Sequence, residues 1–126
     1  MCRLTYILVM ILFISFSCKQ EQKGSSINQD ISVQKAAELS SKGFLYVDLR
    51  TKKEIDRDGK IDGSIHIDYK SNDFDTQISL LPKDKKYIAY CASGGRSSKS
   101  LATFNKYNIE VYNMLGGYGD WKKTYN

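Results

Sequence analysis

The sequence predicts an α/β domain, a small parallel sheet with helices on both faces. Segments with helical spacing alternate with short apolar runs throughout residues 31–126. Two of these runs, 44–47 and 87–90, are continuous and rich in aliphatic and aromatic side chains, which is typical of strands buried on both faces. A chain of 126 residues, 41% of them hydrophobic, has room for one such domain.

Cap and turn residues place the expected helices between these strands. Ser32 can cap a first short helix, which Gly43 is placed to end. Thr51 and Glu54 have the spacing of a capping box at the start of a second helix. The remaining segments are expected as brief strands over 65–67 and 109–112, and as helices over 74–81, over 97–107 with Leu101 and Phe104 inward, and after Gly116-Gly117 around Trp121.

The charge balance excludes some partners. The formal net charge is +5, from 19 basic and 14 acidic side chains, which is consistent with a solvated lysine surface. No basic helix with interleaved aromatic residues is present, so nucleic acid is not expected as a partner. The positive excess still favours small anionic substrates. No metal is expected, because His66 is the only histidine and no second cysteine lies near Cys91.

A processing segment is predicted at the N-terminus. Arg3 is followed by an apolar run over 4–16, which suits a signal peptide and is short for a membrane span of about 20 apolar residues. The run is followed by Ser17-Cys18, which resembles the lipobox of bacterial lipoproteins, although Ser15 and Phe16 depart from that pattern. A plain cleaved signal and an uncleaved anchor are the alternatives.

This interpretation divides the chain into three parts. Residues 1–17 are expected to be a lipoprotein-type signal peptide, 18–30 a flexible tether lipidated at Cys18, and 31–126 the folded domain. The protein would then be extracytoplasmic, attached by its lipid to a bacterial membrane and facing the periplasm or the cell surface. We expect a monomer.

Cys91 is the candidate nucleophile. Of the three cysteines, Cys2 would leave with the signal and Cys18 would be blocked by lipid, so no internal disulfide can form. A lone free thiol outside the cytoplasm is a liability unless it has a chemical role. The alternative is a buried structural cysteine at a strand end.

The residues after Cys91 favour the chemical role. Cys91 is placed at the carboxyl end of a strand, where open α/β sheets bind ligands, and a helix follows. The glycines allow successive N–H groups to turn inward, while the helix N-terminus and Arg96 add positive charge. We expect these groups to lower the pKa of the thiol and to stabilise a persulfide sulfur. The expected cradle consists of Ala92, Ser93, Gly94, Gly95 and Arg96.

Four segments in order give a resemblance to a known family. They are 46–50 with Glu54 following, 59–64, 91–97 and 115–121. In this order they resemble the motifs of single-domain rhodanese-like sulfurtransferases, over about residues 31–121. The resemblance implies a parallel α/β fold and no cofactor. It implies that Cys91 becomes a persulfide, taking sulfur from thiosulfate or another persulfide and passing it to a thiol or cyanide acceptor.

The sequence departs from the family at Lys60, which stands where the family usually has histidine. His66 is expected to be a strand residue and no replacement for it. Arg50 and Glu54 are expected to form a structural pair near the loop. Tyr118 and Trp121 are expected in the core and as a lid over the site.

Two other functions remain open. A phosphatase or arsenate reductase also cradles a cysteine, but its loop has one more residue before the arginine than the segment from Cys91 to Arg96. The shorter loop better suits one sulfur atom. A non-catalytic sulfur carrier or binding module is the second alternative, and failure of the domain to accept sulfur from any donor would favour the binding module.

Overall fold

The computed structural model describes residues 29–126. The predicted signal peptide, the lipidation site Cys18 and all but the last two residues of the tether lie outside this range and stay predictions. Within the described range, no helix combines the length and apolar character needed to cross a membrane.

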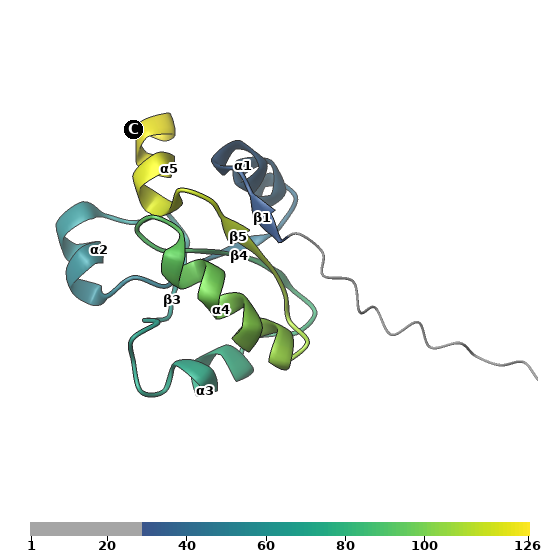
Figure 1. Ribbon diagram of the computed structural model, residues 1–126. Helices are drawn as coiled ribbons and strands as arrows, with labels where there is room; N and C mark the ends of the chain where they lie inside the picture. The colour runs from purple at the N-terminus through teal and green to yellow at the C-terminus, as the bar shows by residue number, and fades with distance from the viewer. Residues whose placement is uncertain (1–28) are drawn as a thin grey trace, which may run out of the picture.

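The sheet has five strands, all parallel, in the order β1-β5-β4-β2-β3 (Figure 1). The parallel sheet confirms the predicted fold class. The edge pairing of β1 with β5 was not predicted, because two residues are too short for a hydrophobic pattern to be seen. The strands are β1 Asp30–Ile31, β2 Leu45–Asp48, β3 Ile65–His66, β4 Lys86–Tyr90 and β5 Glu110–Met114.

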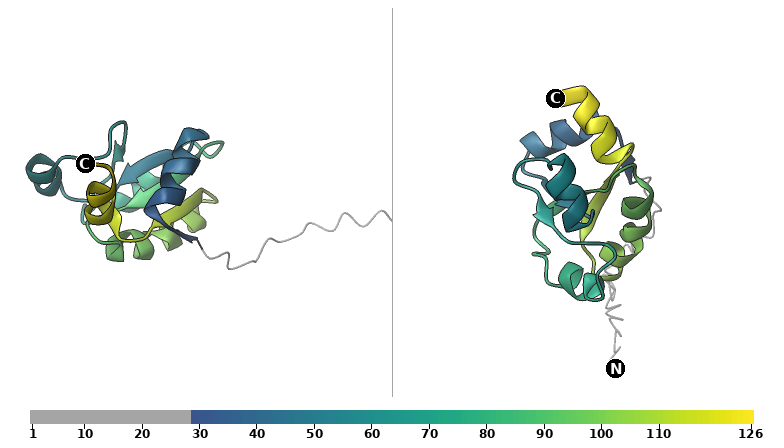
Figure 2. Two further views of the ribbon diagram at one scale, coloured as in Figure 1. Left: turned by 90° about the horizontal axis from the view of Figure 1, so that it is seen from above. Right: turned by 90° about the vertical axis from the view of Figure 1, so that its left-hand side faces the viewer.

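Helices cover both faces of the sheet, as predicted (Figure 2). Buried residues of α3 and α4 belong to one core cluster, and those of α1 and α5 belong to the other. Helix α2 buries no residue fully and lies at the edge of the domain. The helices are α1 Val33–Ser41, α2 Lys52–Asp58, α3 Phe74–Ser79, α4 Gly95–Lys106 and α5 Gly117–Tyr125.

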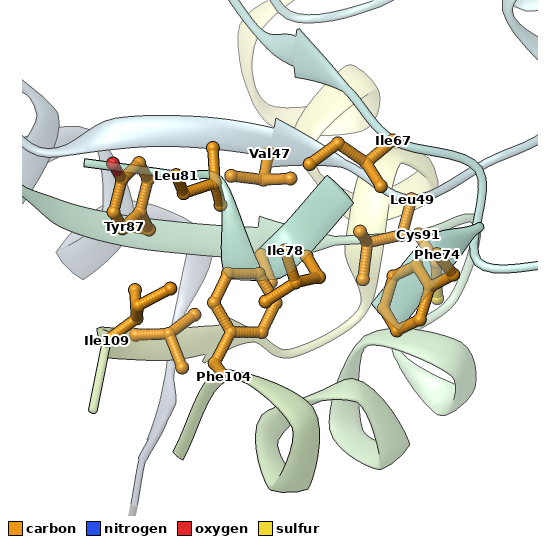
Figure 3. Packing of buried hydrophobic residues seen from close by; sticks show 12 residues of the cluster. Val47, Leu49, Ile67, Phe74, Ile78, Leu81, Tyr87, Cys91, Phe104 and Ile109 are labelled. Carbon is orange, nitrogen blue, oxygen red and sulfur yellow. The ribbon is translucent and has the colours of Figure 1, made fainter. Parts of the chain in front are cut away.

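Alternation along the central strands divides the core in two. Tyr87, Ala89 and Cys91 point toward α3 and α4, whereas Ile88 and Tyr90 point toward α1 and α5. Figure 3 shows the first cluster, with Cys91 at one end of it. The side chain of Cys91 is therefore part of the core on the α3 and α4 face.

The predicted caps are present, with one shift. The Ser32 hydroxyl accepts from the Lys35 N–H, and Thr51 forms the predicted capping box with Glu54. Helix α4 begins at Gly95, two residues earlier than predicted, because Gly94 adopts a left-handed conformation, with φ +108°, and turns the chain directly into the helix.

Candidate active site

Cys91 follows the last residue of β4 and opens the loop that leads into α4. Its side chain is only 1% exposed and packs in the core cluster that also contains Leu49 and Phe74 (Figure 3). The loop residues Ala92 and Ser93 and the first residue of α4, Gly95, are exposed. The thiol therefore lies just beneath an exposed loop at the carboxyl end of the sheet.

Hydrogen-bond donors surround the sulfur from the side of the loop. The Gly94 N–H donates to Cys91 Sγ at 3.1 Å, and the Ser97 hydroxyl lies 3.6 Å from the same atom. Burial raises the pKa of the thiol, but the N–H and hydroxyl of Ser97 and the N–H groups of Gly94 and Ser93 lower it more. The pKa of Cys91 is therefore below its ordinary value, as the sequence predicts.

Ser97 is the donor that sequence reasoning missed. It was expected to begin the helix, but with α4 starting at Gly95 it lies within the first turn. N–H groups of a first turn have no partner inside the helix, so the Ser97 N–H is available to the sulfur. The Gly94-Gly95 pair could have indicated this position, because glycine at 94 allows the helix to start before Ser97.

A buried chain of polar groups holds the Ser97 hydroxyl. This hydroxyl donates to Asn113 Oδ1 at 2.6 Å, and the amide of Asn113 donates to Asp30 Oδ1 at 2.8 Å. Ser97 and Asn113 are both buried. The edge strand β1 and strand β5 therefore fix the position of the hydroxyl beside Cys91, although most of its one proton's hydrogen bonding goes to Asn113.

Replacing Ser97 with alanine is expected to raise the pKa of the Cys91 thiol modestly, because it removes a hydroxyl that shares its one proton between Asn113 Oδ1 at 2.6 Å and Sγ at 3.6 Å, while the Ser97 N–H remains. Alkylation by iodoacetamide, which needs the thiolate, should slow roughly two- to fivefold at pH 6–7, the effect of about one weak hydrogen bond. The inflection of rate against pH should move to higher pH. Ser100→Ala is the control, because its buried hydroxyl donates to the Ser97 carbonyl and not to sulfur; equal profiles for both variants would contradict the assignment.

Arg96 does not present a free charge to the sulfur. Its guanidinium donates both Nη atoms to Glu54, at 2.8 Å to Oε2 and 2.6 Å to Oε1. This contact holds the pKa of the Glu54 carboxyl well below its usual range. The pKa of the Arg96 guanidinium is raised chiefly by Glu54 and, to a smaller extent, by the nearby sulfur of Cys91. The positive charge of Arg96, which was expected from the sequence to act on the sulfur, therefore interacts with both Glu54 and Cys91.

The predicted pairing of Arg50 with Glu54 is wrong. Arg50 and Asp48 are two residues apart at the end of β2, so their side chains share a face and form a buried pair. Arg50 Nη2 lies 2.7 Å from Asp48 Oδ2, and the guanidinium lies over the Tyr118 ring at 4.0 Å. The Tyr90 hydroxyl donates to the same carboxylate at 2.8 Å.

Tyr118 is a core residue, as expected, but Tyr118 and Trp121 pack in the α1 and α5 cluster, while Cys91 packs in the other cluster, so they do not form the expected lid over the thiol. Tyr118 is buried, and its ring stacks on Trp121, which is half-buried against the same cluster. The side chain of Lys60 is directed to the Ser64 carbonyl at 3.3 Å. His66 is in β3, as expected, and its Nε2 donates to the Arg50 carbonyl at 2.7 Å.

Fold and site together define a class: a small parallel α/β domain whose cysteine follows a central strand and is ringed by donors from a helix-forming loop. Residues 32–124 match the Rhodanese-like domain, and the chain belongs to this family.

Two curated relatives have names that state an activity. The chain is 36% identical to thiosulfate sulfurtransferase GlpE of Ectopseudomonas mendocina, over 75% of this chain and 85% of that protein. It is 31% identical to the chloroplastic thiosulfate sulfurtransferase 16 of Arabidopsis thaliana, over 79% of this chain and 92% of that protein. Among solved structures, a rhodanese-related protein from Thermoplasma volcanium is similar with a TM-score of 0.68 and 25% identity, covering 76% and 92% of the two chains.

Proposed function

We propose that this protein is a sulfurtransferase that carries sulfane sulfur on Cys91. The observation that carries the proposal is the set of donors from Ser93, Gly94 and Ser97 around one sulfur atom. These groups stabilise a thiolate before the reaction and a persulfide anion after it. Relatives named thiosulfate sulfurtransferases support the same chemistry.

The proposed cycle has two displacements. The Cys91 thiolate attacks the outer sulfur of thiosulfate or of a persulfide, and the sulfite or thiolate remnant leaves with the bonding electron pair. The outer sulfur of the resulting Cys91 persulfide is then taken by an acceptor thiolate or cyanide, and the Cys91 thiolate is restored. No general base is needed if the thiol is already ionised.

Access to the sulfur requires a local movement. Because Cys91 is 1% exposed, a donor reaches Sγ only when a neighbouring segment is displaced. Ala92, Ser93 and Gly95 are exposed, although Gly94 between them is buried, so we expect this segment to move. Burial of the thiol also favours the second candidate function, a sulfur carrier or binding module that opens only against a partner.

Incubation of the purified protein with thiosulfate tests the proposal. We expect an added mass of about 32 daltons, one sulfur atom, located on Cys91 by peptide mapping and absent from Cys91→Ser. Addition of cyanide should then remove the mass and yield thiocyanate. An adduct that small acceptors do not remove would identify a carrier, and no adduct from thiosulfate or glutathione persulfide would contradict sulfur transfer.

A further inference from the structure

Glu54 is bound to Arg96, the positively charged side chain of the loop that would otherwise be free to bind a doubly charged sulfur donor. Its carboxylate takes both Nη donors of Arg96, and the two side chains are about equally and only partly exposed, at 21% and 20%. A thiosulfate oxygen pair would have to displace this carboxylate to make the same two hydrogen bonds. A donor of lower charge needs no such displacement.

Glu54 is itself held in place from the other side. Its Oε2 accepts from the Thr51 N–H and from the Thr51 hydroxyl, both at 2.9 Å, within the capping box of α2. Figure 1 shows α2 on the side of the domain where α4 begins. The carboxylate is thus fixed by its own helix and by Arg96 together, and it does not swing away from the loop at low cost.

The charges around the sulfur also oppose a dianion. The Cys91 thiolate and Glu54 contribute two negative charges, and Arg96 contributes one positive charge. Arg57, which lies near enough to Glu54 to interact with it, is paired with Asp58 at 2.7 Å. The local sum is negative, so a donor with two negative charges meets more repulsion than a donor with one.

We propose that Glu54 is a specificity-determining residue that selects singly charged sulfur donors, such as thiol persulfides, over the thiosulfate dianion. This inference rests on the proposed sulfurtransferase function and names its donor class. Glu54 acts through Arg96 and the field at the sulfur, and it does not itself react.

Two donors that differ by one charge test the inference. Thiosulfate transfers its outer sulfur to the Cys91 thiolate and releases sulfite, while methanethiosulfonate transfers the same atom and releases methanesulfinate. The donor ratio is the rate constant for loading Cys91 from methanethiosulfonate divided by that from thiosulfate, followed by mass spectrometry in a single turnover. We expect Glu54→Gln to lower this ratio roughly three- to tenfold, the effect of removing one partly screened charge.

Glutamine keeps an oxygen for Thr51 and for Arg96, so the capping box can persist. Glu38→Gln is the control, because it removes an exposed carboxylate that is paired with Lys35 and Lys42 and lies outside the site. It should leave the donor ratio unchanged. An unchanged ratio in Glu54→Gln, or an equal fall in Glu38→Gln, would overturn the inference.

The unmodified protein provides a second measurement that needs no variant. Added salt screens the repulsion, so the donor ratio should fall as ionic strength rises from about 0.01 to 0.5 M. A ratio independent of salt would also count against the inference. Absence of loading from both donors is a different result, because it would overturn the proposed sulfurtransferase function and not only the role of Glu54.

Discussion

Arg50→Met is expected to lower the free energy of unfolding by about 3–5 kcal/mol, since it leaves the Asp48 carboxylate buried without its cation. The two side chains are 1% and 0% exposed and share two hydrogen bonds, at 3.1 and 2.7 Å. Arg50 also donates to the Gly59 carbonyl at 2.7 Å. Since a domain of this size is stable by only about 5–15 kcal/mol, urea unfolding should show a large shift in midpoint.

Two further variants separate the pair from a general loss of arginine. Arg57→Met removes an exposed arginine bonded to Asp58, and the midpoint should barely move. Asp48→Asn combined with Arg50→Met removes both charges and keeps an acceptor for the Tyr90 hydroxyl. The double variant should therefore be more stable than Arg50→Met alone. If Arg50→Met lowers the free energy of unfolding no more than Arg57→Met does, the buried pair of Asp48 and Arg50 does not stabilise the domain as proposed.

The parts of the site that lie within one short segment were predictable from the sequence. The apolar run before Cys91 indicated a buried strand, and the two glycines after it indicated a loop of inward N–H groups. Both features depend on residues adjacent in the chain. The direction of the pKa shift at Cys91 followed from them.

The partners of the charged residues were harder to predict, for a physical reason. Glu54 had a correct local assignment in the capping box, but its second partner, Arg96, lies 42 residues away. Only the packing of α2 beside the start of α4 brings the two together. The partner of Arg50 could have been predicted from the sequence, because side chains two residues apart along a strand lie on the same face, and Asp48 is two residues from Arg50.

The thiol is more buried than the sequence suggested. The sequence places Cys91 at the end of a strand but does not show which face it joins. Alternation along β4 directs its side chain toward α3 and α4, where Phe74 and Leu49 belong to the same cluster. The side chain of Cys91 is therefore both a core residue and the candidate nucleophile. Its reactivity depends on the position of the loop that follows it.

Gly117→Ala is expected to displace the loop and slow the loading of Cys91 about hundredfold, the scale of effect that small misplacements of reacting groups produce. Gly117 begins α5 with φ +58°, and a Cβ there would lie 2.4 Å from the Cys91 carbonyl oxygen. The next two N–H groups, of Tyr118 and Gly119, donate to the Cys91 and Ala92 carbonyls at 2.8 and 3.0 Å. The first turn of α5 thus fixes the backbone of Cys91 and Ala92 by hydrogen bonds.

Gly63→Ala separates backbone strain from the clash. Gly63 also has a positive φ, +77°, but nothing lies within 4 Å of an added Cβ. We expect Gly63→Ala to lower the free energy of unfolding by about 1–2 kcal/mol and Gly117→Ala by about 2–5 kcal/mol. Only Gly117→Ala should slow loading, measured with thiosulfate at equal fractions folded. Loading of Gly117→Ala at the unmodified rate would show that α5 does not position Cys91, and that the loop is held by α4 alone.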